Sequence, residues 1–254
     1  MRFFLRLLQI VYNLYAAAVL LLLTVLLAPF VFLTVLIPEK KRGNAIYYIC
    51  AKVADLGMLL WGIHHTRIFE TPHDVSKPSI FVFNHISYLD ALIILKAVRK
   101  QHFRGLGKYE ISRIPLFGFI YKSAVIMVKR DSAEDRARSV ADMKKAIAEN
   151  ISVILAPEGT FNMSSEPLSK FYDGAFRIAI ETQTPIRPLL FLDAFDRLNY
   201  NSILSLTPGR SRIVYLEEVS VNGYSLDDLP FLRQHVFQKM EEALIRYKAS
   251  WIAN

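Results

Sequence analysis

The stretch SIFVFNHISYLD, residues 79–90, joins a short apolar run to the start of a helical pattern through a polar turn. Residues 79–83 are rich in Val and Phe and lie between a proline and an asparagine, which predicts a buried β-strand. Residues 87–100 show helical periodicity and predict a helix immediately after the strand. A strand that leads directly into a helix is the repeating unit of α/β folds.

The turn between this strand and helix contains His85, and Asp90 follows five positions later. Ser87 and Asp90 fit the S-x-x-[DE] capping box, so Asp90 can be explained as part of a helix cap. The pair also suits catalysis, because a carboxylate that binds one imidazole nitrogen fixes the tautomer and stabilises the imidazolium. The two explanations are compatible, since a capped turn would hold the pair in place.

Downstream of this unit, apolar runs alternate with amphipathic stretches, which predicts a layered α/β fold with a mixed, largely parallel sheet flanked by helices. The further predicted strands are 123–130, 151–159, 185–194 and 211–221, and the further predicted helices are 131–150, 171–183 and 226–250.

Polar signatures follow three of the predicted strands. They are NHISYLD at 84–90, KR at 129–130 and PEGT at 157–160. Ligands of open α/β sheets bind outside the carboxyl ends of the strands. The three signatures therefore predict one site at that edge of the sheet.

The N-terminal part of the chain is apolar, and residues 7–37 contain no charged residue. About 20 such residues in a helix can enter a bilayer, whereas the apolar region of a cleavable signal peptide is about 7–15 residues long. We therefore expect an uncleaved membrane-associated segment over 1–64, followed by a catalytic domain over 65–254. Basic residues flank the apolar run on both sides, which favours a two-helix motif that bends near Pro29 over a single anchor, with the catalytic domain on the cytoplasmic face.

The 254-residue chain has a formal net charge of +8, and 53% of its residues are hydrophobic. The positive charge suits anionic lipids or phosphorylated ligands. No zinc-finger or RNP-like pattern is present, so we expect no nucleic-acid partner. The single cysteine, Cys50, excludes an intrachain disulfide and lies in an apolar helical pattern that favours packing. The adjacent histidines at 64–65 lack an accompanying acid cluster, so we expect no metal site.

Four blocks of sequence together resemble the glycerolipid acyltransferase family. They are NHISYLD, then 114–130, then APEGTF at 156–161, then TPIRPLL at 184–190, in the order and with the spacing typical of that family. Within that family, the chain resembles the bacterial 1-acyl-sn-glycerol-3-phosphate acyltransferases. The resemblance implies transfer of a fatty acyl group from acyl-CoA or acyl carrier protein to the 2-hydroxyl of a lysophospholipid, with phosphatidate as the product and no cofactor.

The resemblance also implies roles for individual residues. His85 would be the general base and Asp90 would orient it. Arg130 matches the family's basic position after the second block and would bind the acceptor phosphate. The block Glu158, Gly159 and Thr160 would contact the glycerol and phosphate of the acceptor, and Gly159 can adopt turn dihedrals closed to other residues.

Lys108, in GLGKYE, is a second candidate for the phosphate and is equally explained as a surface charge. Phe161 departs from the family pattern, which often has Arg immediately after the Thr, so Lys170 or Arg177 would have to replace that cation. The alternatives are an O-acyltransferase for glycerol 3-phosphate, another lysophospholipid or an amino-acid lipid, and a non-catalytic lipid-binding membrane protein.

Overall fold

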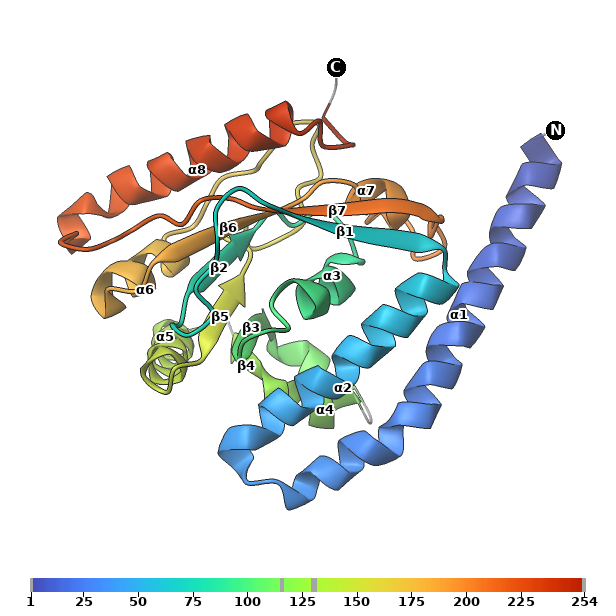
Figure 1. Cartoon of the computed structure of the whole chain (residues 1–254), viewed down its shortest axis with the longest axis horizontal. Coiled ribbons are helices and arrows are strands. Elements are labelled where there is room, and N and C mark those ends of the chain that lie inside the picture. The colour runs from blue at the N-terminus through green and yellow to red at the C-terminus, as the bar shows by residue number, and fades with distance from the viewer. Residues whose placement is uncertain (1, 115–116, 129–131, 253–254) are drawn as a thin grey trace.

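The protein folds around one seven-stranded sheet of order β1-β7-β6-β2-β5-β3-β4 (Figure 1). The computed structural model describes residues 2–114, 117–128 and 132–252. All neighbouring strands run parallel except β6 and β7, which are antiparallel. The mixed, largely parallel α/β sheet that the sequence predicts is therefore confirmed. The strands are β1 (Ile63–Phe69), β2 (Ile80–Phe83), β3 (Phe103–Lys108), β4 (Val125–Val128), β5 (Ser152–Leu155), β6 (Ile186–Phe191) and β7 (Gly209–Tyr215).

Helices cover both sides of the sheet. In Figure 1, α8 lies on one side of β6 and β7, and α2 and α3 lie on the other. The apolar side chains of β2, β5 and β6 are buried along their whole length between these layers, as expected for central strands of a parallel sheet. The helices that follow the N-terminal region are α3 (Asp90–Ala97), α4 (Phe117–Ala124), α5 (Ala133–Ala148), α6 (Gly174–Thr182), α7 (Ala194–Arg197) and α8 (Leu229–Arg246).

Two strands, β1 and β3, were not predicted from the sequence. β1 pairs only with β7, at the edge of the sheet, and it carries polar side chains that obscure the apolar signal. β3 contains two glycines, a residue type depleted in strands. The structure explains Gly107, since a Cβ atom there would collide with the hydroxyl group of Tyr121.

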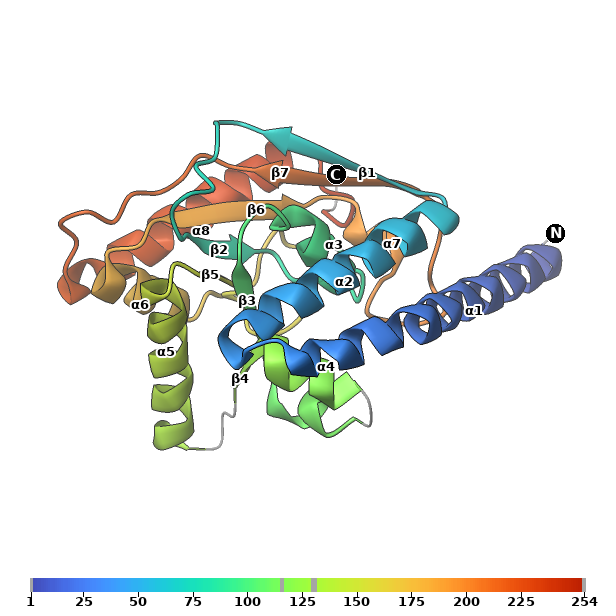
Figure 2. The ribbon, with the colours of Figure 1, turned by 60° about the horizontal axis from the view of Figure 1, so that its bottom comes forward.

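The N-terminal region forms two helices, α1 (Arg2–Leu33) and α2 (Glu39–Leu60), that pack against each other (Figure 2). Pro29 lies inside α1, and the reversal of the chain comes after it, between Thr34 and Pro38. The Arg42 side chain donates hydrogen bonds to the carbonyl groups of Thr34, Val35 and Ile37. This cation therefore supplies additional donors to the carbonyl groups where the helical segment ends.

The predicted boundary at residues 64–65 falls inside β1, close to the end of α2. Met58 and Trp61 belong to the same buried core as the sheet. The α2 helix is therefore packed into the α/β domain, while the N-terminal end of α1 projects beyond it (Figure 2). Cys50 is half-buried against the small cluster of Val31, Ile46 and Ala124, in agreement with its expected packing role.

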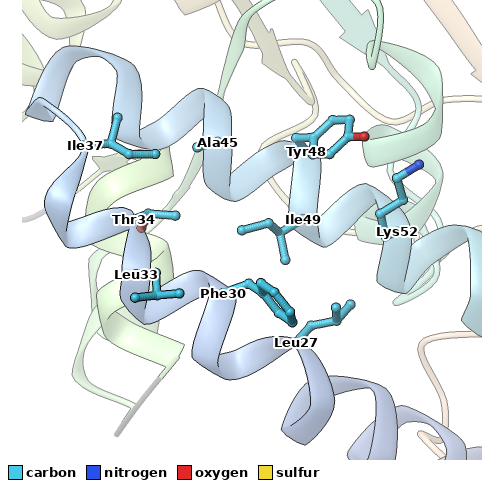
Figure 3. A pocket seen from close by; sticks show the side chains of 9 residues that line it. All are labelled: Leu27, Phe30, Leu33, Thr34, Ile37, Ala45, Tyr48, Ile49 and Lys52. Carbon is cyan, nitrogen blue, oxygen red and sulfur yellow. The ribbon is translucent and has the colours of Figure 1, made fainter.

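The α1 helix is largely exposed and apolar. Within the described ranges, Phe4–Leu36 is the one helical segment that is long and apolar enough to cross a membrane. Near the reversal, a hollow of about 460 Å³ lies between α1 and α2 (Figure 3). Its lining is mostly apolar, with side chains such as Leu27, Phe30 and Ile49, and it contains none of the predicted site residues. This part of the surface is suited to hydrocarbon and not to acid–base chemistry.

Candidate active site

The predicted site lies where β2, β5 and β6 end beside one another. β2 pairs with both β5 and β6, so the turns that follow these strands meet at one edge of the sheet. The Asn84 side chain donates to the Phe191 carbonyl at 3.2 Å and accepts from the Phe191 backbone N–H at 2.8 Å. This pair of hydrogen bonds fixes the end of β2 to the end of β6, directly before His85.

His85 and Asp90 form the predicted pair. His85 Nδ1 lies 2.8 Å from Asp90 Oδ2. The Asp90 side chain is 1% exposed and that of His85 is 29% exposed. His85 Nε2 has no hydrogen-bond partner among the described residues. An imidazole with Nδ1 held by a carboxylate and Nε2 free can accept a proton at Nε2.

Asp90 is held rigidly from the backbone. Its Oδ2 atom also accepts hydrogen bonds from the backbone N–H groups of Ile86, at 2.9 Å, and Ser87, at 3.0 Å. Burial raises the pKa of Asp90, while the hydrogen bonds from His85 and the two backbone groups act in the opposite direction. Three donors that converge on one oxygen favour the carboxylate as an acceptor for the imidazole.

The predicted capping box is only half formed. The Asp90 carboxylate accepts from the Ser87 N–H, as the motif requires, but the Ser87 hydroxyl oxygen accepts from Leu89 N at 2.9 Å and not from the N–H of Asp90. The helix begins at Asp90, so Asp90 occupies its first position and not the third. The acid therefore serves the turn and the imidazole more than the helix cap.

The turn after β5 holds the backbone of His85 from both sides. Glu158 Oε1 accepts from the His85 N–H at 2.9 Å, and the Asn162 N–H donates to the His85 carbonyl at 2.7 Å. Glu158 Oε2 accepts from the N–H and hydroxyl of Ser169, at 2.8 and 2.7 Å. Burial raises the pKa of Glu158, and these hydrogen bonds partly oppose that effect. Gly159 has φ of 70°, so the left-handed turn expected of this glycine is confirmed.

An aromatic cluster covers the exposed side of the imidazole. The Phe161 ring lies 4.2 Å from the His85 ring, between centroids, and contacts Tyr88 edge-on at 5.1 Å and Tyr200 at 6.2 Å. The position where the family often has Arg is therefore occupied by an apolar ring beside the His85–Asp90 pair. Phe161 was recognised from the sequence as a departure from the family pattern. Its contact with Tyr200 could not be predicted, because Tyr200 lies in a distant loop.

The chain matches a model of a known protein family. Residues 62–192, more than half of the chain, match the family model described as Acyltransferase. The chain belongs to the acyltransferase family. The resemblance inferred from the four sequence blocks is thereby confirmed, and those blocks fall within the matched range.

Curated relatives of this acyltransferase chain carry related names. The 1-acyl-sn-glycerol-3-phosphate acyltransferase beta of Homo sapiens is 27% identical over 159 residues, which cover 62% of this chain and 56% of that protein. The 1-acyl-sn-glycerol-3-phosphate acyltransferase of Cocos nucifera is 25% identical over 186 residues, covering 72% and 58%. That of Helicobacter pylori is 27% identical over 169 residues, covering 66% and 69%. The match therefore spans a little over half the length of the first two relatives.

A solved structure shows the same fold over the whole acyltransferase chain. The crystal structure of the 1-acyl-sn-glycerophosphate (LPA) acyltransferase PlsC from Thermotoga maritima superposes with a TM-score of 0.73 at 21% sequence identity, covering 100% of each chain. The N-terminal helices are included in this coverage, so they are part of the shared fold.

The other predicted site residues are placed less closely around the imidazole. Thr160 is exposed beside Gly159, and Lys108 is exposed at the end of β3, next to β5. Arg130 lies outside the described residues. Of the two suggested replacements for the missing Arg, Arg177 pairs with Glu181 along α6. The exposed Lys170 follows Ser169, which binds Glu158. Within the part of the acyltransferase chain that the structure describes, no group of three or more His, Cys, Asp or Glu side chains could hold a metal ion.

The contacts of Glu158 predict a measurable role in positioning. Glu158→Gln would leave one of the Ser169 or His85 N–H groups facing an amide NH2 group, which costs about 1–3 kcal/mol for an unsatisfied buried donor. A displaced His85 backbone should also lower kcat by about 10- to 100-fold. Thermal unfolding and steady-state kinetics measure the two effects, and Glu166→Gln, at an exposed carboxylate in the same loop, is the matched control. Unchanged stability with a raised acceptor KM would instead indicate that Glu158 contacts the acceptor.

Proposed function

We propose that this acyltransferase moves a fatty acyl group from a thioester of coenzyme A or acyl carrier protein to the 2-hydroxyl of 1-acylglycerol 3-phosphate, which gives phosphatidate. The observation that carries the proposal is the His85–Asp90 pair at the end of β2, with one imidazole nitrogen bound by a buried carboxylate and the other free. The names of the curated relatives support the choice of acceptor.

The pair supplies what attack by an alcohol requires. An alcohol is a poor nucleophile until a base removes its proton. His85 Nε2 takes that proton as the hydroxyl oxygen attacks the thioester carbonyl carbon, and Asp90 stabilises the resulting imidazolium. The tetrahedral intermediate then collapses, the carbon–sulfur bond breaks, and the imidazolium returns the proton to the thiolate. The sequence contains no G-x-S-x-G nucleophile elbow, so the proposed transfer is direct, with no acyl-enzyme.

A thiol-release assay tests the proposal. The purified full-length protein is given acyl-CoA or acyl carrier protein thioester with a panel of acceptors, and thiol release is measured with the acylated product. We expect release that depends on 1-acylglycerol 3-phosphate and yields phosphatidate. Thiol release with a different acceptor only would support acyl transfer but assign another acceptor substrate. Saturable lipid binding without thiol release would instead support a non-catalytic lipid-binding protein.

We also propose that the protein is bound to the cytoplasmic membrane through α1, with the catalytic domain on the cytoplasmic face. The exposed apolar surface of α1 and the apolar hollow beside it support membrane association. Acyl thioesters of coenzyme A and acyl carrier protein are cytoplasmic compounds, which favours the cytoplasmic orientation. A long-chain lysophospholipid resides in the bilayer, so an anchored enzyme meets its acceptor at the membrane surface.

Phe161 favours a second candidate, an acceptor whose head group does not depend on a cation at this position. Phe161→Arg would add a guanidinium beside the catalytic pair, and a guanidinium binds phosphate oxygens in bidentate fashion. We expect the KM for 1-acylglycerol 3-phosphate to fall about tenfold relative to that for a phosphate-free 1-acylglycerol, since one charge-assisted hydrogen bond contributes about 1.5–3 kcal/mol.

Kinetics with both acceptors measure this ratio. Phe161→Leu, which keeps an apolar side chain and adds no charge, is the control and should leave the ratio unchanged. A Phe161→Arg variant with the wild-type ratio would show that the head group lies away from residue 161.

A further inference from the structure

The segment from Leu198 to Leu206, between α7 and β7, is tied to the membrane helix α1. The Asn13 side chain donates to the Leu206 carbonyl at 3.3 Å and accepts from the Leu206 N–H at 3.1 Å, and Gln9 Nε2 donates to the same carbonyl at 2.6 Å. Figure 2 shows the segment passing alongside α1. Two of the few polar residues in an otherwise apolar helix are therefore used to hold this loop.

The same segment is tied to the catalytic turn at its other end. The Ser87 hydroxyl donates to the Leu198 carbonyl, and Ser87 forms an isolated antiparallel bridge with Asn199. Tyr200 stacks on Phe161, which lies against the His85 ring. The loop is therefore a continuous connection between α1 and the residues around the catalytic histidine.

The tip of the loop presents two apolar side chains to solvent. Ile203 is 73% exposed and Leu204 is 55% exposed. The tip is ordered by its own hydrogen bonds, with Leu204 N donating to Ser202 Oγ at 3.0 Å and Ser205 Oγ donating to the Ser202 carbonyl at 2.6 Å. Single exposed apolar residues are common on protein surfaces. These two differ because they are adjacent, are held in a fixed turn and belong to a loop that is hydrogen-bonded to α1 at Leu206.

The composition of the loop suits a lipid environment. Residues 198–208 contain no charged side chain, so insertion of the tip would bury no charge. Arg210, at the start of β7, lies 3.6 Å from the Asp193 carboxylate, and its side chain is 65% exposed, which leaves the guanidinium accessible to anionic head groups.

We propose that Ile203 and Leu204 form a second membrane contact, inserted into the same lipid surface as α1, and that the loop thereby holds the catalytic pair at the interface where the acceptor resides. The inference rests on the proposed membrane association of α1. The occupant of this surface is the bilayer itself, since the loop that carries the exposed apolar tip is bound to α1 through Gln9 and Asn13 and contains no charged side chain.

Depth measurements test the inference without using activity. Single cysteines at Leu204, at Leu8 on α1 and at Phe231 on α8 are introduced into a Cys50→Ala background and labelled with NBD. Phe231 is a matched control because it is 63% exposed, comparable with Leu204, and lies in the first turn of α8, a helix on the other side of the sheet from α2. The full chain is bound to phosphatidylcholine–phosphatidylglycerol vesicles with or without nitroxide groups on the acyl chains. We expect about twofold or stronger quenching at positions 204 and 8, as for side chains buried roughly 5–10 Å deep, and none at 231.

The quenching pattern distinguishes the loop contact from the membrane anchoring by α1. Quenching at position 8 but not at 204 would overturn the loop contact and leave the α1 anchor intact. Absence of quenching at both positions would overturn the membrane association as well. Shielding of position 204 that does not depend on lipid would indicate a protein partner and would also overturn the inference.

Activity provides a second measurement. In the double variant Ile203→Ser/Leu204→Ser we expect kcat/KM on vesicle-borne acceptor to fall about tenfold, because the apolar contact that holds the site at the interface is lost. Both side chains are exposed, so thermal stability should remain unchanged. Phe231→Ser is the control and should retain wild-type kinetics. Wild-type kcat/KM in the stable double variant would contradict the inference.

Discussion

Replacement of His85 by alanine is expected to lower kcat by about 10²–10⁴-fold, the usual loss for a missing general base. The imidazole is the group whose free nitrogen can take the proton of the acceptor hydroxyl, because its other nitrogen is occupied by Asp90. Its backbone is fixed independently, through Glu158 and Asn162, so removal of the side chain should leave the turn folded. Thiol release under saturating donor and acceptor measures the loss.

The control for this prediction is a histidine on the same sheet. His64→Ala removes an exposed imidazole from the edge strand β1 and should leave thiol release unchanged. Circular dichroism and thermal unfolding of the His85→Ala protein should match those of the wild type. A folded His85→Ala protein with wild-type turnover would be incompatible with the general-base mechanism.

The features that could be predicted from sequence depend on residues close together in the chain. The strand at 80–83, the turn with His85 and the acid at 90 lie within eleven residues, and both the strand and the pair occur in the structure. The convergence of the turns after β2 and β5 was also predictable, because parallel neighbouring strands end at the same edge. The third signature, KR at 129–130, lies outside the described residues, and its strand β4 is separated from β5 by the unpredicted β3.

Other features depend on contacts between distant residues and left no local pattern. Glu158 is an acidic residue in a turn at the end of a strand, which is typical of a ligand-binding residue. Its carboxylate is instead buried between His85 and Ser169, and these partners are evident only from the fold. The capping box is only half formed because the Ser87 hydroxyl oxygen accepts from Leu89 N, while the same hydroxyl donates to the Leu198 carbonyl more than a hundred residues away. The edge strand β1 could not be predicted for a similar reason. It is a strand because it pairs with β7, and its own composition does not indicate one.

Replacement of Asp90 by asparagine is expected to lower kcat by about 10²–10⁴-fold while the protein remains folded. The amide oxygen of the new side chain can still accept from His85 Nδ1 and from the N–H groups of Ile86 and Ser87, so the hydrogen-bond geometry at the Oδ2 position is retained. The negative charge that stabilises the imidazolium is lost. Activity should therefore fall far more than stability does.

The stability of the Asp90→Asn protein has two opposing contributions. Its amide NH2 group would occupy the place of Oδ1, which is buried and has no partner among the described residues, at a cost of about 1–3 kcal/mol. In the wild type, burial raises the pKa of Asp90 above its ordinary value of about 3.9, so ionisation of the folded protein carries a cost of its own. The raised pKa stabilises the folded protein with Asp90 protonated. This stabilisation is fully present at pH values below the ordinary pKa and is lost as the pH rises through the folded-state pKa.

Only the second contribution depends on pH, so a titration separates the two. The free energy of unfolding of the wild type relative to Asp90→Asn should decrease as the pH rises from about 4 towards neutrality. Denaturant unfolding of both proteins at several pH values measures the difference, and thiol release at neutral pH measures the catalytic loss. If Asp90→Asn kept wild-type turnover, Asp90 would serve only to hold the turn, and the proton transfer assigned to the pair would have to be assigned to His85 alone.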